Sequence, residues 1–143
     1  MYTVNMAEYV PKTQLDETLA VAPTQGKRNL EPFLSYAKER SLPFNILEDV
    51  QVTNDAEIHV KDDDLWLCLE GEVSFLCGGQ LSETWFGKRA DGSENQNEVK
   101  AKTLTGGTEH ILKPGDWLWI PAGEPHQHSA QGTARLMIIK IPR

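Results

Sequence analysis

The sequence predicts an all-β protein, an antiparallel β-sandwich or β-barrel with a short helical extension before it. Short runs with strand character follow one another from Phe44 onward, and Gly, Pro, Asp and Asn residues separate them. No segment of helical length lies between these runs, which favours antiparallel pairing over βαβ units. The segments rich in helix formers come before Pro43. A length of 143 residues suits one domain with a single core.

Residues 1–43 are expected to form a partly helical extension packed on the barrel. Helix formers concentrate in residues 13–20 and 29–40. Pro32 is tolerated only in the first turn of the second helix. The residues after it make a narrow apolar stripe suited to docking: Phe33, Leu34 and Ala37. Plain packing against the barrel accounts for this stripe.

Residues 44–143 are expected to form the barrel, with an inserted loop or hairpin at about residues 78–107. Strands are predicted at residues 44–53, 56–61, 64–71, 72–79, 98–107, 110–116, 117–123, 125–130 and 134–142. The centre of the insertion, ADGSENQNE, cannot bury enough apolar surface to join a core. We expect it to cross one rim of the barrel, as a lid over a pocket or as a solvated hairpin end.

The stretch GDWLWIPAGEPHQH places two of the four histidines close together. Its residues 117–120 indicate a strand buried on both faces. A turn that no helix can continue follows, fixed by Pro121, Gly123 and Pro125. Beyond it, His126 and His128 point to the same side if the chain is extended. This arrangement suits a metal or a substrate.

Composition limits the possible binding partners and the possible cellular compartment. The formal net charge of −7 argues against nucleic acid, which binds basic faces, and leaves small molecules open. No run approaches the ~20 apolar residues that cross a bilayer, and the start MYTVNMAEYV lacks the features of a signal peptide. Cys68 and Cys77 are not expected to face each other, so we expect reduced core thiols. The sequence therefore predicts a cytoplasmic protein without a membrane partner.

A second stretch, AEIHVKDDDLWLCLEGEVSF, brings acidic and imidazole groups together. Glu57 and His59 share one face of an extended segment, and the next strand offers Asp64, Trp66 and Cys68 on one side. A carboxylate and an imidazole are thus expected to converge across a hairpin. Taken alone, the triplet DDD is most often a solvated turn, and a lone histidine is most often an ordinary sheet residue.

Together the two stretches resemble the motifs of the cupin family. In one cupin motif a glycine is followed by five residues, a proline, any residue, a glycine, two residues and a histidine. Every fixed position is matched here, by Gly115, Pro121, Gly123 and His126. The other motif has two histidines one residue apart, an acidic residue after three or four positions and a closing glycine. Its later positions are matched by His59, Asp64 and Gly71, and the resemblance covers about residues 46–142.

The chain departs from the family pattern at three positions. Glu57 stands where the family usually has its first histidine, Asp64 replaces the commoner glutamate, and Ala130 stands where an asparagine is frequent. The resemblance implies an all-β fold, an antiparallel jelly-roll (cupin-like) β-barrel. It also implies a metal site made of Glu57, His59, Asp64 and His126. Two imidazoles with one or two carboxylates suit Fe(II), Mn(II), Zn(II) or Ni(II) and leave positions for a substrate. A degenerate site without metal is the alternative.

Two further residues are candidates for the pocket. His128 can be an extra ligand, a proton carrier, a partner of a ligand, or only a polar wall residue. Trp66 can line the pocket, although aromatic residues on central strands are more often core. His110 has the weaker case and is left out of the site.

The sequence leaves two functions open. One is a metal-dependent enzyme of the cupin type, a dioxygenase, isomerase or lyase acting on an oxygen-rich small substrate, with Glu57 as candidate general base if it does not bind the metal. The other is a non-catalytic module that binds a sugar or another small ligand. A homodimer through the apolar run LMIIKI is the expected assembly, unless barrel closure uses the same residues.

Overall fold

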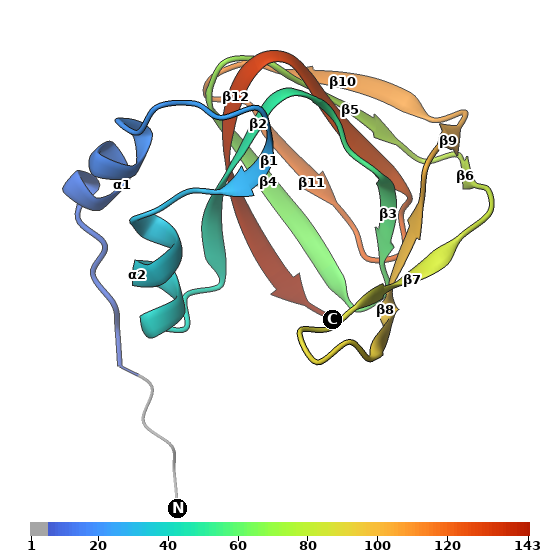
Figure 1. The fold of residues 1–143 in the computed structure, drawn as a ribbon, viewed down its shortest axis with the longest axis horizontal. Coiled ribbons are helices and arrows are strands. Elements are labelled where there is room, and N and C mark those ends of the chain that lie inside the picture. The colour runs from blue at the N-terminus through green and yellow to red at the C-terminus, as the bar shows by residue number, and fades with distance from the viewer. Residues whose placement is uncertain (1–5) are drawn as a thin grey trace, which may run out of the picture.

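The computed structural model describes residues 6–143, and it consists mainly of β-strands that curl into an antiparallel barrel (Figure 1). The first five residues of the expected extension, and with them the start of MYTVNMAEYV, lie outside the described residues. The two helices are α1 (Lys12–Leu19) and α2 (Phe33–Glu39). The strands are β1 (Gly26–Asn29), β2 (Phe44–Thr53), β3 (Ala56–His59), β4 (Asp62–Glu70), β5 (Val73–Cys77), β6 (Gln80–Leu81), β7 (Trp85–Lys88), β8 (Glu94–Ala101), β9 (Leu104–Thr105), β10 (Thr108–Leu112), β11 (Trp117–Ile120) and β12 (His126–Pro142).

Strand β12 belongs to both layers of the barrel. Its second half lies between β2 and β4, and β1 and β11 extend that layer on either side. Its first residues pair with β5 and β3, and β10, β8 and β7 extend the other layer. The register shifts between Ala130 and Thr133, where the strand passes from one layer to the other. What the sequence indicated as two strands is therefore one.

An apolar core fills the space between the two layers. Large side chains such as Phe75, Trp66 and Leu136 are buried in it. Both cysteines are free and buried, as expected from the sequence. Ile138 also faces this core, so barrel closure uses the run LMIIKI.

The helices cover the outer face of the layer that contains β2, β12 and β4 (Figure 1). Phe33 and Ala37 of α2 are buried against Ile46 and Met137, which confirms the docking role of the apolar stripe for these two residues. No helix within residues 6–143 is long and apolar enough to span a membrane.

A buried ion pair ties the extension to the barrel. Arg135 on β12 donates hydrogen bonds to Glu48 of β2 at 2.8 Å and to the carbonyl oxygens of Leu19 and Val21 at 2.6 Å each. Both charged side chains are almost fully buried. Strand β1, which the sequence reading did not anticipate, adds to the edge of β2. The division into an extension and a barrel stays a prediction.

The expectation that residues 117–120 are buried on both faces is wrong. Trp117 and Trp119 are 57% and 54% exposed, whereas Ile120 is buried. Within the described residues β11 pairs only with β4, so it is an edge strand whose outer face nothing covers. The region about 78–107 forms four strands, of which β8 pairs with β3 beside the site described next.

Candidate metal site

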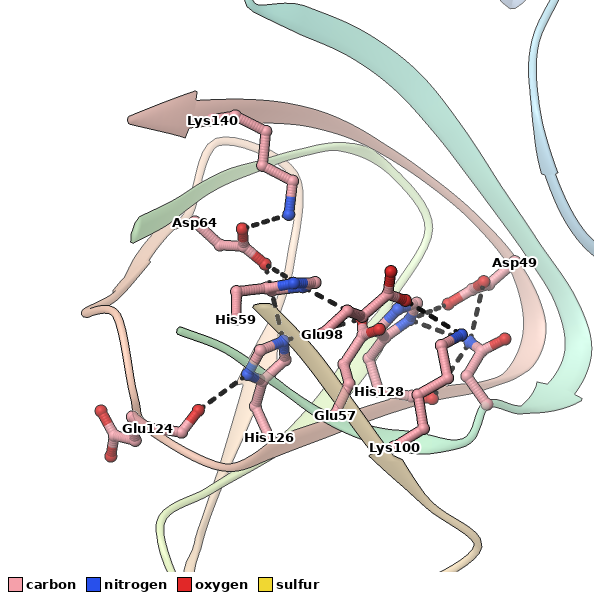
Figure 2. Close-up of polar contacts among 11 residues, drawn as sticks. Asp49, Glu57, His59, Asp64, Glu98, Lys100, Glu124, His126, His128 and Lys140 are labelled. Atoms are coloured by element: carbon pink, nitrogen blue, oxygen red, sulfur yellow. Dashed lines mark hydrogen bonds and ion pairs between the residues drawn. The ribbon is translucent and has the colours of Figure 1, made fainter. Parts of the chain in front are cut away.

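The fold brings together the four side chains that the sequence singled out as metal ligands (Figure 2). His59 Nε2 lies 3.5 Å from Glu57 Oε1 and 3.5 Å from Asp64 Oδ2. His126 Nε2 lies 3.8 Å from Glu57 Oε1 and 3.5 Å from Asp64 Oδ2. One ligand atom from each of Glu57, His59 and His126 lies within 4.8 Å of the other two. This buried cluster can hold a metal ion.

The convergence does not arise through a hairpin, as the sequence reading assumed. Among the described strands, β3 pairs with β8 and β12, whereas β4 pairs with β11 and β12. Glu57 and His126 are direct neighbours in the β3–β12 ladder. Asp64 reaches the cluster from β4 in the other layer, so the site forms where the two layers meet.

The separations match the spacing of ligands around a common ion. Distances of 3.5 to 3.8 Å are too long for good hydrogen bonds. With metal–ligand bonds of about 2.0–2.2 Å, two ligands of a tetrahedral site lie about 3.3–3.6 Å apart. The side chains are therefore spaced for an ion rather than for direct contact with one another.

Two buried atoms of the cluster have no partner among the described residues. These are Asp64 Oδ2 and His126 Nε2, both of which point toward the other ligands. The opposite nitrogen of His126, Nδ1, lies 3.0 Å from the carbonyl oxygen of Glu124. Donation from Nδ1 to that carbonyl leaves Nε2 as the metal-binding nitrogen. The donor set therefore fits a divalent metal.

Charge within the cluster shifts its proton equilibria. Burial raises the pKa of Glu57, but the nearby imidazoles of His126 and His59 hold it well below its usual range. Burial likewise raises the pKa of Asp64, and His126 with Lys140 brings it below normal. Burial lowers the pKa of His126, yet Asp64 and Glu57 raise it to about 9. Two carboxylates thus favour positive charge at this point of the barrel.

The turn before His126 is fixed by contacts that the sequence reading missed. Asp63 accepts hydrogen bonds from the Ala122 amide at 2.8 Å and from Trp119 Nε1 at 3.1 Å. The Gly123 amide donates to the His59 carbonyl oxygen at 2.8 Å, and Gly123 has the expected positive φ, +87°. Asp63 and Asp64 are neighbours on β4 and face opposite ways, so one holds the turn while the other enters the site. Strand alternation across DDD could have indicated this.

His128 lies apart from the four clustered side chains although it shares their face of β12. Its Nδ1 lies 2.5 Å from Asp49 Oδ2, and its ring packs against those of Trp66 and Phe75 at centroid distances of 5.3 and 5.2 Å. Asp49 and Asn54, which also contacts His128 Nδ1, were not anticipated. This buried pair adjoins the site without joining it.

A cavity of about 380 Å³ opens beside the cluster. Glu57, His59 and Asp64 line it, and Trp66 lines it as the sequence reading suggested. Its size is at the small end of ligand sites, which span about 300–1,000 Å³. A small molecule bound in this cavity would contact the predicted ligands directly.

No family model matches the sequence, and neither does any curated protein. Among solved structures, Escherichia coli ycfD superposes with a TM-score of 0.56 at 18% identity, over 86% of this chain and 36% of that one. The Drosophila melanogaster CENP-C cupin domain gives 0.47 at 15% identity, over 73% and 59%. The Clostridium difficile EutQ protein gives 0.46 at 14% identity, over 81% and 61%. This chain thus spans less than two thirds of each of these proteins.

These similarities concern the fold alone. The positions of the motif residues in the structure agree with that fold. The barrel has the two-layered antiparallel arrangement of a jelly roll, with helices confined to the region before Pro43. Gly123 and His126 occupy the turn and the inward-facing position that their motif implies, and His59 faces them. The chain therefore has the cupin fold.

Proposed function

We propose that this protein is a metal-dependent enzyme that acts on an oxygen-rich small molecule bound beside the four clustered side chains. One observation carries the proposal: Asp64 Oδ2 and His126 Nε2 are buried, have no hydrogen-bond partner within residues 6–143, and face two further metal-ligating groups next to a cavity. An unpartnered buried polar atom costs about 1–3 kcal/mol, and more if charged. A shared cation removes this cost for both atoms at once.

The ligands would be His59 and His126 through nitrogen, and Glu57 and Asp64 through oxygen. This mixed set suits Fe(II), Mn(II), Ni(II) or Zn(II). These four side chains would fill a four-coordinate ion, whereas an ion that takes six ligands would leave two positions for a bidentate substrate. Lys140, which contacts Asp64 Oδ1 at 2.5 Å, would keep Oδ2 turned toward the ion.

A divalent ion held here supplies a Lewis acid or, as Fe(II), a centre for dioxygen chemistry. If Glu57 does not bind the metal, it is the candidate base, because its carboxylate borders the cavity and can take a proton from a carbon next to a carbonyl group. In the metal-free protein two imidazoles hold the pKa of Glu57 below its usual range, and a divalent cation beside it would hold the carboxylate ionised as well, which is the form that accepts a proton.

Metal binding is tested first, on protein purified without a histidine tag. We expect stoichiometric uptake of one divalent ion, measured by elemental analysis and calorimetric titration. His126→Ala should lower metal affinity by more than about a hundredfold, because it removes a ligand rather than one of the supports, whose loss costs about 10–100-fold. His110→Ala is the matched control, since His110 is an exposed histidine on β10. Full metal occupancy in His126→Ala would contradict the site.

Catalysis is tested next on the loaded protein. Hydroxy acids, oxo acids and sugars are incubated with the Fe(II), Mn(II), Ni(II) and Zn(II) forms and followed by nuclear magnetic resonance. We expect turnover with at least one metal, and a loss of turnover without loss of metal in Glu57→Gln if Glu57 is the base. Ligand binding by metal-free protein without turnover would favour the non-catalytic binding module instead.

A further inference from the structure

The cavity beside the site is unusually rich in lysine. Lys27 from β1, Lys100 from β8 and Lys140 from β12 all line it. These strands are far apart in the sequence, so the fold itself gathers the three cations. The whole chain carries a formal net charge of −7, so three lysines in one cavity lining contrast with the overall charge of the protein. Lysines in a concave site raise the local concentration of anions.

The three lysines differ in what they already contact. Lys140 is paired with Asp64 at 2.5 Å, and Lys100 is paired with Glu98 at 3.3 Å (Figure 2). Lys27 is exposed at the cavity mouth and makes no ion pair within residues 6–143. Lys27 is thus the cation most available to an incoming ligand.

Metal binding would make the net charge of the cavity lining more positive. The carboxylates in its lining are those of Glu57, Asp64 and Glu98. Three lysines and a divalent ion outweigh three carboxylates, so the loaded cavity is positive. A neutral ligand gains nothing from this field, whereas an anion gains on entry and once bound.

The remaining lining is mostly apolar. Side chains from the start of β2, the residues before it and β12 contribute Leu42, Pro43, Phe44, Leu47 and Ile138. Trp66 also lines the cavity, and its buried Nε1–H has no acceptor among the described residues. An indole N–H can only donate, so a ligand oxygen is a suitable partner. The cavity therefore offers a cationic mouth, an apolar wall and an inner donor.

We propose that this cavity selects small organic acids with an apolar body. The carboxylate lies toward Lys27 and Lys100, and the hydrocarbon part packs against Phe44 and Ile138. A second oxygen group of the acid faces Trp66 and the metal. The inference rests on the proposed function for the metal ion that makes the loaded cavity positive and for making such an acid the substrate of that site.

The experiment measures binding of matched acids and amides to the Zn(II)-loaded protein by calorimetry. The probes are hexanoate, 2-hydroxyhexanoate and 2-oxohexanoate, each compared with its uncharged primary amide. We expect at least one acid to bind about tenfold or more tightly than its amide. The preference should shrink at high ionic strength, because the mouth is open to solvent.

Two variants locate the effect. Lys27→Gln should weaken binding of the acid by about three- to tenfold, in the range of a partly exposed charge contact, and leave amide binding unchanged. Lys88→Gln removes the same charge from an exposed position on β7 outside the cavity lining and should change neither. Equal effects of the two variants would overturn the inference.

The remaining outcomes separate this inference from the proposed function. If the protein binds metal but no acid more tightly than its amide, the inference is wrong and the metal site stands. If an acid binds through Lys27 but no divalent metal binds, the organic-acid cavity stands and the metal-dependent enzyme is lost.

Discussion

At the residue scale, a proton and a metal ion compete for Nε2 of His126. Burial opposes its charged form, but Asp64 and Glu57 raise its pKa to about 9 in the metal-free protein. Nδ1 is committed to the Glu124 carbonyl, so the titrating proton occupies Nε2, the atom that would bind metal. Below this pKa the ion must displace that proton.

The pH dependence of metal affinity follows from this competition. Between about pH 7 and 8.5 the affinity should rise close to tenfold per pH unit, with about one proton released, and it should level off above pH 9. Calorimetry in buffers of different ionisation enthalpy counts the released protons. An affinity that does not change over this range would mean that Nε2 is already deprotonated in the free protein.

The ligand residues could be predicted because the two motifs that resemble those of cupins are each short and continuous in the sequence. Glu57 and His59 alternate on one strand, and His126 follows a turn fixed by proline and glycine. The supporting residues could not be found in this way. Asp49 contacts His128 although the two residues are 79 positions apart in the sequence. Such a contact depends on the register between strands rather than on local spacing.

At the element scale, the turn over residues 121–125 sets the position of His126. Its backbone is anchored at Ala122 by Asp63 and at Gly123 by the His59 carbonyl. Hydrogen bonds from Arg143, Ala122 and Trp119 outweigh desolvation and lower the pKa of Asp63 to about 2. Asp63 is therefore charged at neutral pH and holds the turn from outside the site.

Replacing Asp63 should weaken metal binding although Asp63 is not a ligand. We expect about a tenfold loss of affinity in Asp63→Asn, the lower end of what supporting residues of metal sites contribute. Asp62→Asn, at the neighbouring position of the same triplet, serves as the control because the Asp62 side chain makes no hydrogen bond or ion pair among the described residues. If both variants bind metal equally well, the turn does not depend on Asp63.

A substitution at Gly123 tests whether the backbone conformation of the turn matters for metal binding. Its φ of +87° disfavours any side chain, yet a Cβ there would meet no atom within 4 Å. Gly123→Ala should therefore cost about 1–2 kcal/mol through strain alone and lower metal affinity with it. Gly132→Ala, which also meets no atom but lacks a positive φ, should be nearly neutral. Equal melting temperatures of the two metal-free variants would remove strain as the cause.

At the scale of the whole molecule, the extension and the barrel are joined through Arg135. This side chain satisfies Glu48 and two carbonyl oxygens at the end of α1. Arg135→Met should lower the free energy of unfolding by about 3 kcal/mol or more, because it leaves a buried carboxylate short of a partner. Arg89→Met, at an exposed hairpin, should cost far less in the same denaturant titration. A loss below about 1 kcal/mol for Arg135→Met would show that the contacts of Arg135 contribute little to holding the extension on the barrel.

The fold class was predictable because alternation, turn residues and the absence of intervening helices all indicated it. The prediction failed for β11, because the burial of a strand depends on what covers it in the fold. This strand has the apolar composition of a buried strand, yet both of its tryptophans are exposed at the edge of the sheet. The homodimer and the cytoplasmic location stay predictions. The run that suggested an interface is used inside the chain, since Leu136 and Ile138 fill the core.

Because β12 belongs to both layers of the barrel, it also limits the order in which the strands can pair during translation. Strands β2 and β4 are separated by β12 in the finished sheet, and β3 and β5 pair with its beginning. At roughly 5–20 residues per second, the earlier strands wait for seconds until residues 126–142 emerge from the ribosome. During that time their apolar edges are open to chaperones and to neighbouring nascent chains. Rare codons between β5 and β12 should therefore lower the soluble yield by prolonging that wait.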